Sequence, residues 1–420
     1  MSLARFPGYV RFWIASTVSD FGTYVTTIAI GVIVVLRLDG GSTEVGLVSA
    51  ARWLPYLLLG LLAGAWLDRR RRKPILVAGD LGRALILASI SILGLAGWLT
   101  LPLLAALMFL FGMLSLLCDA AFQSFIPQLV PRALLVRANA RLEQSDSVAQ
   151  TTGPALAGWL IHVLSAPVAL LVDAASYVIS GAVVASIPGS GVRTSPAPAA
   201  ASLRQRILEG LRWTYRHPRL APFALSTHLW FVFYSMFGAV FTVYALRERD
   251  LGAAGLGVVL AFAGAGAVLG TFVSTRIGES LGTGPTVILG RALHPAAFVI
   301  IAAAGFAAVG DWPGFAAIAA GQFLLGLGLG IEGPHEMGYQ QAITPDRLMG
   351  RMSATMRSVN RGMIVLGAPL GGITAEVIGN RPTILIAASG IILVVLFMCA
   401  SDFRNARIED QLSEEDATAG

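Results

Sequence analysis

The sequence predicts an all-α protein that crosses a lipid bilayer many times, and three observations support this fold class. Of its 420 residues, 55% are hydrophobic and only 13% are charged, which is too apolar for a soluble globule of that size. The apolar residues form long runs, and about 20 apolar residues cross a membrane as a helix. Alternation with a period of two, which is typical of strands, is absent from the sequence, so an outer-membrane barrel is not expected.

Windows of about 19 residues predict twelve membrane-spanning helices joined mostly by short loops. Arginines cluster in alternate connections, so the positive-inside rule places both termini in the cytoplasm. No cleavage site follows the first apolar run, which is expected to stay as the first spanning helix. The predicted spans are approximately 10–36, 45–67, 75–98, 101–124, 140–164, 167–187, 221–246, 254–277, 286–309, 313–335, 353–378 and 382–402.

The longest connection, about 188–219, divides the chain into two halves. Its second part places Leu203, Ile207 and Leu211 on one helical face with arginines opposite, the pattern of a helix lying in the membrane interface. We therefore expect four regions: an N-terminal six-helix half at 1–187, a cytoplasmic linker with an interfacial helix at 188–220, a C-terminal six-helix half at 221–403 and an acidic cytoplasmic tail at 404–420.

The two halves are predicted to be repeats of each other. At one constant offset and without a gap, several Phe, Leu, Gly, Pro and Arg positions of the first half fall on the same residue types in the second half; Phe109 falls on Phe323 and Arg137 falls on Arg351. The pentapeptide LGRAL at 81–85 recurs at 289–293. Pseudo-symmetric halves of this kind are typical of transporters with a site near the bilayer midplane.

A run of five cations, 69–73, separates the second and third predicted spans. In hydrocarbon each charge would cost about 2.5–3.5 kcal/mol, so the run must form a tight cytoplasmic turn. A generic positive anchor explains the cations but neither Gly64 nor Asp68. The stretch resembles the loop between the second and third helices of the major facilitator superfamily. The matching residues are Gly64, Asp68, Arg69, Arg72 and Lys73.

Three further stretches, 122–131, 137–140 and 209–218, resemble the enterobactin-exporter-like, or transmembrane secretion effector, branch of that superfamily. The resemblance implies a twelve-helix fold that works by alternating access in a bacterial inner (plasma) membrane. It also implies that Asp68 and Arg69, supported by Gly64 and Arg72, hold a cytoplasmic gate. Glu143 and Asp146, near the cytoplasmic end of the fifth span, are expected to belong to the gate rather than to contact substrate.

Two acids in the first half are candidates for binding protons or substrate. Asp20 is followed by Tyr24 one turn later, and Asp119 is followed by Gln123 in the same way. The resemblance places the first, fourth, seventh and tenth helices around the transport cavity, so both acids are expected near substrate. The alternative is that each is a buried, hydrogen-bonded structural acid.

In the second half, Glu332, His335 and Glu336 lie on one face of the tenth predicted span. Two carboxylates that close favour sharing a proton, and His335 could exchange it. Proton or substrate handling is one interpretation, and a salt-bridge role is the other. A metal site is not expected, since no second histidine is near.

Smaller signals complete the set of candidates. His228 and Tyr234 in the seventh span form a polar-aromatic patch that either contacts substrate or packs internally. Asp80 and Arg83, three residues apart, are expected to neutralise each other. Arg357 and Arg361 could either neutralise the acids of the tenth span or meet an anionic substrate. Small residues in the fifth and eleventh spans predict close helix packing: Gly153, Pro154, Gly158, Gly367 and Gly371. Those of the fifth span partly resemble a motif that is associated with export in the superfamily's antiporters.

The sequence excludes several function classes. It has no phosphate-binding G-x-x-x-x-G-K loop, so ATP hydrolysis by this chain is not expected. Its two cysteines, Cys118 and Cys399, lie in apolar runs, and neither a disulfide framework nor a cofactor is predicted. The net charge of +6 comes from loop arginines that signal topology, so nucleic acid is not an expected partner.

The predicted function is that of a monomeric, proton-coupled exporter of amphipathic small molecules such as drugs, siderophores or secondary metabolites, not that of an enzyme. Protons and the lipid bilayer are the expected partners besides the substrate. An importer or facilitator on the same fold is the nearer alternative. A non-transporting receptor or a membrane-embedded hydrolase is a remote alternative, because no nucleophile-base constellation or appended domain is present.

Overall fold

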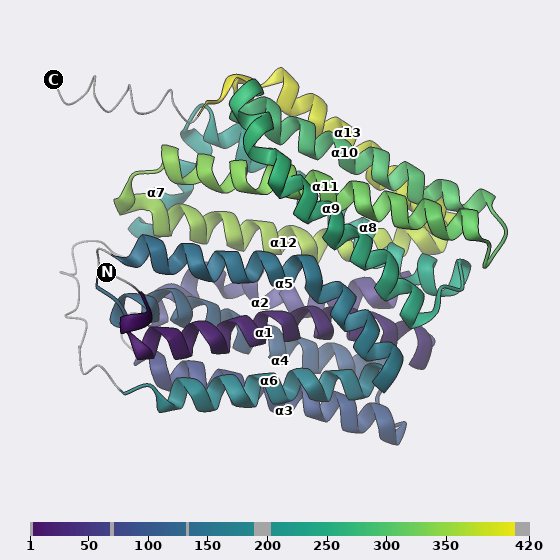
Figure 1. The fold of residues 1–420 in the computed structure, drawn as a ribbon, viewed down its shortest axis with the longest axis horizontal. Helices are drawn as coiled ribbons and strands as arrows, with labels where there is room; N and C mark the ends of the chain where they lie inside the picture. The colour runs from purple at the N-terminus through teal and green to yellow at the C-terminus, as the bar shows by residue number, and fades with distance from the viewer. Residues whose placement is uncertain (1–2, 68–70, 132–133, 189–202, 408–420) are drawn as a thin grey trace. The chain divides into compact units, whose positions relative to one another are not determined.

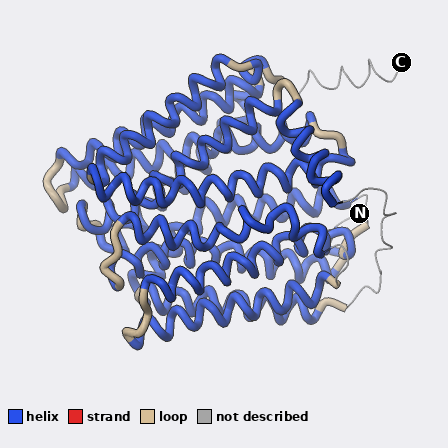
Figure 2. The backbone as a smooth tube through the Cα atoms, turned by 180° about the vertical axis from the view of Figure 1, so that it is seen from behind, coloured by secondary structure: helices blue, strands red, loops and turns tan. Residues whose placement is uncertain are grey.

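The computed structural model describes residues 3–67, 71–131, 134–188 and 203–407, and within them the chain is built from helices and connecting loops (Figure 2). The chain divides into two compact units, which are described separately. The N-terminal unit contains residues 1–40 and 47–200, and the C-terminal unit contains residues 41–46 and 201–420.

Six long helices form the N-terminal unit, and α2 belongs to it from Leu47 onward. In it α1 packs against α5 and α6, and α3 packs against α4 and α6 (Figure 1). These contacts bury an apolar core that includes Phe12, Phe111 and Leu170. The helices are α1 (Pro7–Val32), α2 (Ser42–Leu67), α3 (Arg72–Ala96), α4 (Leu101–Phe125), α5 (Leu135–Leu164) and α6 (Ala166–Ser186).

The C-terminal unit has six long helices and one short one. The helix α11 packs between α9 and α10, while α8 packs against α12 and α13, and the short α7 lies on α12. The helices are α7 (Leu203–Arg216), α8 (Leu220–Val243), α9 (Gly252–Leu281), α10 (Thr283–Ala303), α11 (Trp312–Ile343), α12 (Asp346–Ile378) and α13 (Asn380–Ala400).

The repeat is visible in the irregular backbone of both units. The first long helix of each unit ends in a five-residue π-helical turn, Ile33–Arg37 in the N-terminal unit and Tyr244–Glu248 in the C-terminal unit. Each turn is followed two residues later by an aspartate with a positive φ, Asp39 at 51° and Asp250 at 50°. π-Helical segments are rare in proteins, so their recurrence at matching places supports the predicted internal repeat.

The corner between the last two helices of each unit is a second shared feature. A single residue joins α5 to α6 and α12 to α13, and both junctions combine a positive φ with an extended ψ, a conformation that only glycine adopts easily. Gly379 has φ 94° and ψ 160°, and Ser165, which holds the matching place in the first unit, has φ 77° and ψ 157°. The two units therefore make the same turn with different residues.

Within the described residues, ten helices are long and apolar enough to cross a membrane. Each of the twelve ranges predicted from hydropathy falls on one long helix, with 45–67 on α2 and 140–164 on α5. Large apolar side chains such as Leu85, Phe272 and Leu393 are exposed on these helices. Exposed apolar side chains in such numbers fit helices whose outer faces contact lipid.

Candidate functional site

The arginine of each repeated LGRAL sequence lies among the helices of its unit. The Arg291 side chain is 1% exposed and the Arg83 side chain is 12% exposed. A buried guanidinium is costly unless acids and hydrogen-bond acceptors surround it. The groups that surround these two arginines are therefore candidates for a functional site.

Arg291 of α10 lies at the centre of a charged cluster with two glutamates of α11. Its side chain is 1% exposed. Nε donates to Oε2 of Glu332 at 3.1 Å, and Nη2 donates to Oε1 of Glu336. Nη1 lies 3.4 Å from the hydroxyls of Ser226 and Thr227 of α8. We call Arg291, Glu332 and Glu336 the Arg291 cluster.

The local sequence explains why the cluster forms. Glu332 and Glu336 are four residues apart, so they project from the same face of α11. Glycines let α10 come close to that face, because a methyl group at Gly290 would lie only 2.7 Å from the carbonyl oxygen of Gly328. The short separation of the two helices lets one guanidinium reach both carboxylates.

Aromatic and imidazole rings line the cluster on the α8 side. The Trp230 indole donates from Nε1 to Nδ1 of His294 at 2.8 Å, and the Tyr234 ring stacks on Trp230 at 4.4 Å. Because Nδ1 accepts this bond, the neutral His294 ring carries its proton on Nε2, which lies 3.7 Å from Oε1 of Glu332. The guanidinium of Arg291 also lies 5.7 Å from the Trp230 ring.

The charges of the Arg291 cluster do not balance when both acids are ionised. Two carboxylates face one guanidinium, which leaves one negative charge buried. The side chain of Glu332 is 4% exposed and that of Glu336 is 19% exposed, so Glu336 has the better access to water. One bound proton would make the cluster neutral.

The predicted group on the tenth span is thus brought together only in part. Glu332 and Glu336 lie in the cluster, but His335 turns away and donates from Nε2 to the carbonyl oxygen of Ser274 at 3.0 Å. The arginine that pairs with both acids is Arg291. Sequence reasoning did not select Arg291 as a site residue, although its place in the repeated pentapeptide was a usable signal.

His228 of α8 belongs to a different hydrogen-bonded chain. Its Nδ1 lies 2.6 Å from Oδ1 of Asn360 of α12, and its Nε2 lies 2.9 Å from the hydroxyl of Tyr215 of α7. If Nδ1 donates to the amide oxygen, Nε2 accepts from Tyr215. Burial raises the pKa of the Tyr215 hydroxyl, which therefore stays a donor. Through these bonds His228 links α7, α8 and α12.

In the N-terminal unit, Arg83 pairs with Asp80 one turn earlier on α3, which confirms the predicted pair. The second oxygen of Asp80, Oδ2, accepts from Ser180 of α6 at 2.8 Å. The guanidinium lies 4.3 Å from the Tyr177 ring. One acid forms the direct ion pair with one base here, and Asp119 and Asp173 interact with the same guanidinium at longer range.

Asp173 of α6 is a second buried acid of this unit. It accepts hydrogen bonds from the hydroxyl of Thr26 of α1 and, at 2.9 Å, from that of Ser176. The sequence had offered no partner for Asp173, because the Thr26 bond joins residues that are 147 positions apart.

The predicted acids Asp20 and Asp119 lie on α1 and α4 and are both partly exposed. Oδ2 of Asp119 accepts from the Tyr56 hydroxyl of α2 at 2.7 Å. Tyr24 lies on the same helix as Asp20, and the Gln123 side chain is outside the described residues. Their roles in binding protons or substrate stay predictions.

Most of the predicted gate lies outside what the structure describes. Asp68 and Arg69 are not among the described residues, and Gly64 and Glu143 lie on α2 and α5 without described side chains. Arg72, at the start of α3, is partly exposed, and Asp146 on α5 is exposed.

Three of the glycines predicted to aid packing lie at helix contacts. A methyl group at Gly153 of α5 would lie 2.9 Å from Cβ of Tyr24, and one at Gly371 of α12 would lie 2.6 Å from the carbonyl oxygen of Met236. Gly367 meets the carbonyl oxygen of Val232 in the same way. Gly158 is buried and Pro154 lies inside α5.

Comparison with known proteins places this geometry in context. A family model described as transmembrane secretion effector matches residues 4–419. The uncharacterised MFS-type transporter y4rN of Sinorhizobium fredii is 26% identical over 382 residues, 89% of each chain. The multidrug efflux pump Tap of Mycolicibacterium fortuitum is 25% identical over 385 residues, 86% of this chain and 87% of Tap.

Solved structures agree with the fold. The crystal structure of the nucleoside transporter NupG superposes with a TM-score of 0.70 at 13% identity, covering 94% of this chain and 98% of NupG. At 13% identity this similarity supports the arrangement of the helices and gives no information about the substrate.

Proposed function

Because this chain belongs to the transmembrane secretion effector family of the major facilitator superfamily and is therefore a secondary transporter, we propose that it exports amphipathic small molecules in exchange for protons. Export is favoured over import because Tap, which aligns with 86% of this chain, is described as a multidrug efflux pump. The proposed location is a bacterial plasma membrane, with both termini in the cytoplasm and a single chain as the working unit.

The main support for proton coupling is the unequal number of acidic and basic groups in the Arg291 cluster. With both acids ionised, one buried negative charge is left without a counter-ion, and uncompensated buried charge is costly. A proton on Glu332 or Glu336 removes that cost and leaves a balanced pair with Arg291. The cluster is thus suited to exist in two charge states that differ by one proton.

The neighbours of the cluster suggest how the proton is passed. Arg291 and His294 face Glu332 from α10, and Tyr234 lies near Glu332 on the α8 side. Glu336 is the more exposed acid, so we assign proton exchange with water to Glu336 and storage to Glu332. Asp20 and Asp119 remain proposed contributors from the N-terminal unit, and Asp68 with Arg69 remains the proposed gate.

The test is substrate-induced proton movement in proteoliposomes that contain the full chain. The added compounds are lipophilic cations, macrolides and catecholate siderophores, and the variant is Glu332→Gln. A matched control is Glu376→Gln, which removes an exposed glutamate from α12 of the same unit. We expect one compound to release protons with the wild type and with the control, but not with Glu332→Gln.

Other outcomes would replace the proposal. A compound carried without proton flux by every variant would describe a facilitator. Uptake in right-side-out vesicles driven by an inward proton gradient would describe an importer. Loss of proton flux in Asp119→Asn but not in Glu332→Gln would move the coupling acid to the N-terminal unit.

A further inference from the structure

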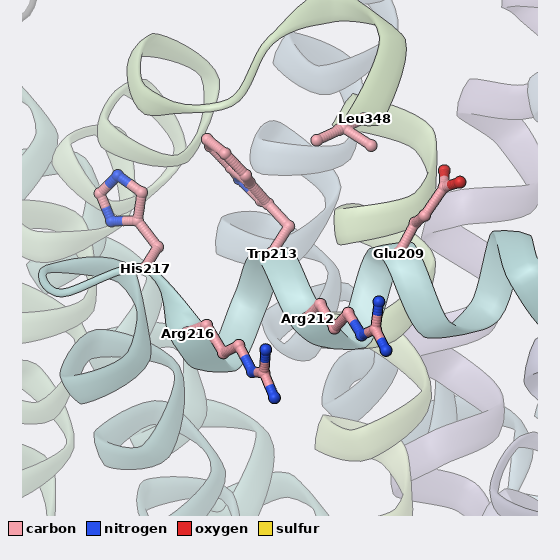
Figure 3. Close-up of a pocket in the computed structure, with 6 residues that line it drawn as sticks. All are labelled: Glu209, Arg212, Trp213, Arg216, His217 and Leu348. Atoms are coloured by element: carbon pink, nitrogen blue, oxygen red, sulfur yellow. The ribbon is translucent and has the colours of Figure 1, made fainter.

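A hollow of about 390 Å³ opens beside α7 in the C-terminal unit, and no part of the Arg291 cluster lines it. We call it the α7 hollow. Figure 3 shows its lining side chains, which come from α7, the residue that follows it and the start of α12. They are Glu209, Arg212, Trp213, Arg216, His217 and Leu348.

The position of the α7 hollow along the helices places it at the edge of the membrane. The candidate span of α11 ends at Ile343, that of α12 begins at Leu348 and that of α8 begins at Leu220. Trp213 donates from Nε1 to Oγ1 of Thr344 at 3.4 Å, one residue beyond the end of the α11 span. The hollow therefore lies where hydrocarbon gives way to lipid headgroups, a depth at which tryptophan is enriched.

The lining of the hollow carries a net positive charge. Glu209 is already neutralised by Arg351, with which it forms an ion pair. Arg212 and Arg216 are exposed, and no acidic side chain in the described part of the chain pairs with either. They leave the same side of α7, one turn apart, so both guanidinium groups can reach a single anion (Figure 3).

The apolar part of the lining indicates what the anion is attached to. Leu348 and the Trp213 ring lie beside the charged groups in the same hollow. Nδ1 of His217 accepts from the backbone N–H of Leu220 at 3.2 Å, so the neutral ring carries its proton on Nε2. Donors on one side and apolar groups on the other match a phosphate diester that carries a lipid tail.

We propose that the α7 hollow binds the headgroup phosphate of an anionic phospholipid. Arg212 and Arg216 donate to the phosphate oxygens, and Trp213 and Leu348 contact the glycerol and the first carbons of the acyl chain. A zwitterionic lipid brings its own ammonium group toward the two guanidinium groups, so the hollow prefers phosphatidylglycerol to phosphatidylcholine. The bound lipid holds α7 at the membrane surface and requires no particular transported substrate.

The test is a binding titration of the full chain in a neutral detergent, followed by native mass spectrometry. The probes are phosphatidylglycerol, phosphatidylcholine and inorganic phosphate. The variants are Arg212→Gln and Arg216→Gln, and the matched control is Arg204→Gln, an exposed arginine of α7 outside the hollow. Each cation near the membrane surface contributes about a fivefold preference for anionic lipid, so each variant should weaken phosphatidylglycerol binding about fivefold.

We expect the control to change the affinity less than twofold and phosphatidylcholine to bind at least tenfold more weakly than phosphatidylglycerol. Equal losses in all three variants would mean diffuse attraction to the helix and would overturn the proposal. So would equal binding of the two lipids. Displacement of the lipid by inorganic phosphate at similar concentrations would assign the hollow to a free anion instead. Thermal unfolding of each variant in the same detergent verifies that the fold is retained.

Discussion

Arg83 and Arg291 occupy the same position of the internal repeat, yet the two units neutralise them differently. Arg83 pairs with Asp80, one turn earlier in the same helix, and a serine satisfies the other oxygen of that acid. Arg291 pairs across helices with Glu332 and Glu336. Both units hold a guanidinium among their helices and differ in the acids that neutralise it. One unit thus holds a balanced pair and the other holds an excess of one acid, which suits the first to structure and the second to proton exchange.

The largest expected difference between the two units is in the loss of unfolding free energy when each arginine is removed. Arg291→Met leaves the buried Glu332 and the partly exposed Glu336 without a counter-ion, and breaking a buried ion pair in this way costs about 3–5 kcal/mol of unfolding free energy. Arg83→Met leaves Asp80, which still accepts a hydrogen bond from Ser180, so we expect a loss of about 1–3 kcal/mol of unfolding free energy. Thermal unfolding in detergent measures both. Equal losses would show that the two sites have the same role.

Removing one acid from each site should distinguish a role in stability from a role in proton coupling. Glu332→Gln leaves Arg291 and Glu336 as a balanced pair, so we expect nearly unchanged stability but at least a tenfold loss of proton-driven transport, equivalent to about 1.4 kcal/mol. Asp80→Asn leaves Arg83 without its acid, so we expect lower stability with retained coupling. Transport and unfolding measured on the same preparations give both readouts, and the reverse pattern would exchange the roles of the two units.

The glycines of the repeated pentapeptide offer a third comparison. A methyl group at Gly290 meets backbone, the carbonyl oxygen of Gly328 at 2.7 Å, whereas one at Gly82 meets the end of the Leu114 side chain at 2.6 Å. A leucine side chain can move and a packed backbone cannot. We expect Gly290→Ala to cost about 1–3 kcal/mol and Gly82→Ala clearly less, as measured by thermal unfolding. A larger loss for Gly82→Ala would contradict the packing described for α10 and α11.

The smallest expected difference in unfolding free energy is between substitutions of the aromatic rings next to the two arginines. Trp230→Phe removes the donor to Nδ1 of His294 and leaves a buried acceptor unpaired, which costs about 1 kcal/mol. Tyr177→Phe removes a 3.2 Å contact with Thr23, whose hydroxyl also bonds to its own helix, so we expect about 0.5 kcal/mol or less. Chemical denaturation in detergent can resolve the two values, and a larger effect at Tyr177 would reverse the expected order.

The sequence predicted what depends on neighbours along the chain. Hydropathy located every long helix, because a long run of apolar residues is a local property. The Asp80–Arg83 pair was predictable for the same reason, since a spacing of three brings two side chains to one helical face. The partners of Arg291 lie 41 and 45 residues away on another helix, and no local pattern connects them.

Function was predicted less completely than the fold. The acids Glu332 and Glu336 were selected, but His335 was grouped with them because helical spacing alone does not reveal that its ring turns toward α9. The hollow beside α7 was not predicted either, because it depends on where three helices end in space. The gate residues Asp68 and Arg69 remain a prediction from the resemblance.

The corner at Ser165 has a consequence for how this protein can evolve. Its repeat partner Gly379 makes the same turn without a side chain, whereas Ser165 holds a backbone conformation that costs a residue with Cβ about 1–3 kcal/mol. One copy of the duplication thus forgoes stability that the other copy keeps. A single codon change to glycine could recover it and offset the cost of new substitutions. In laboratory selection for altered substrates, that position is a natural place to begin.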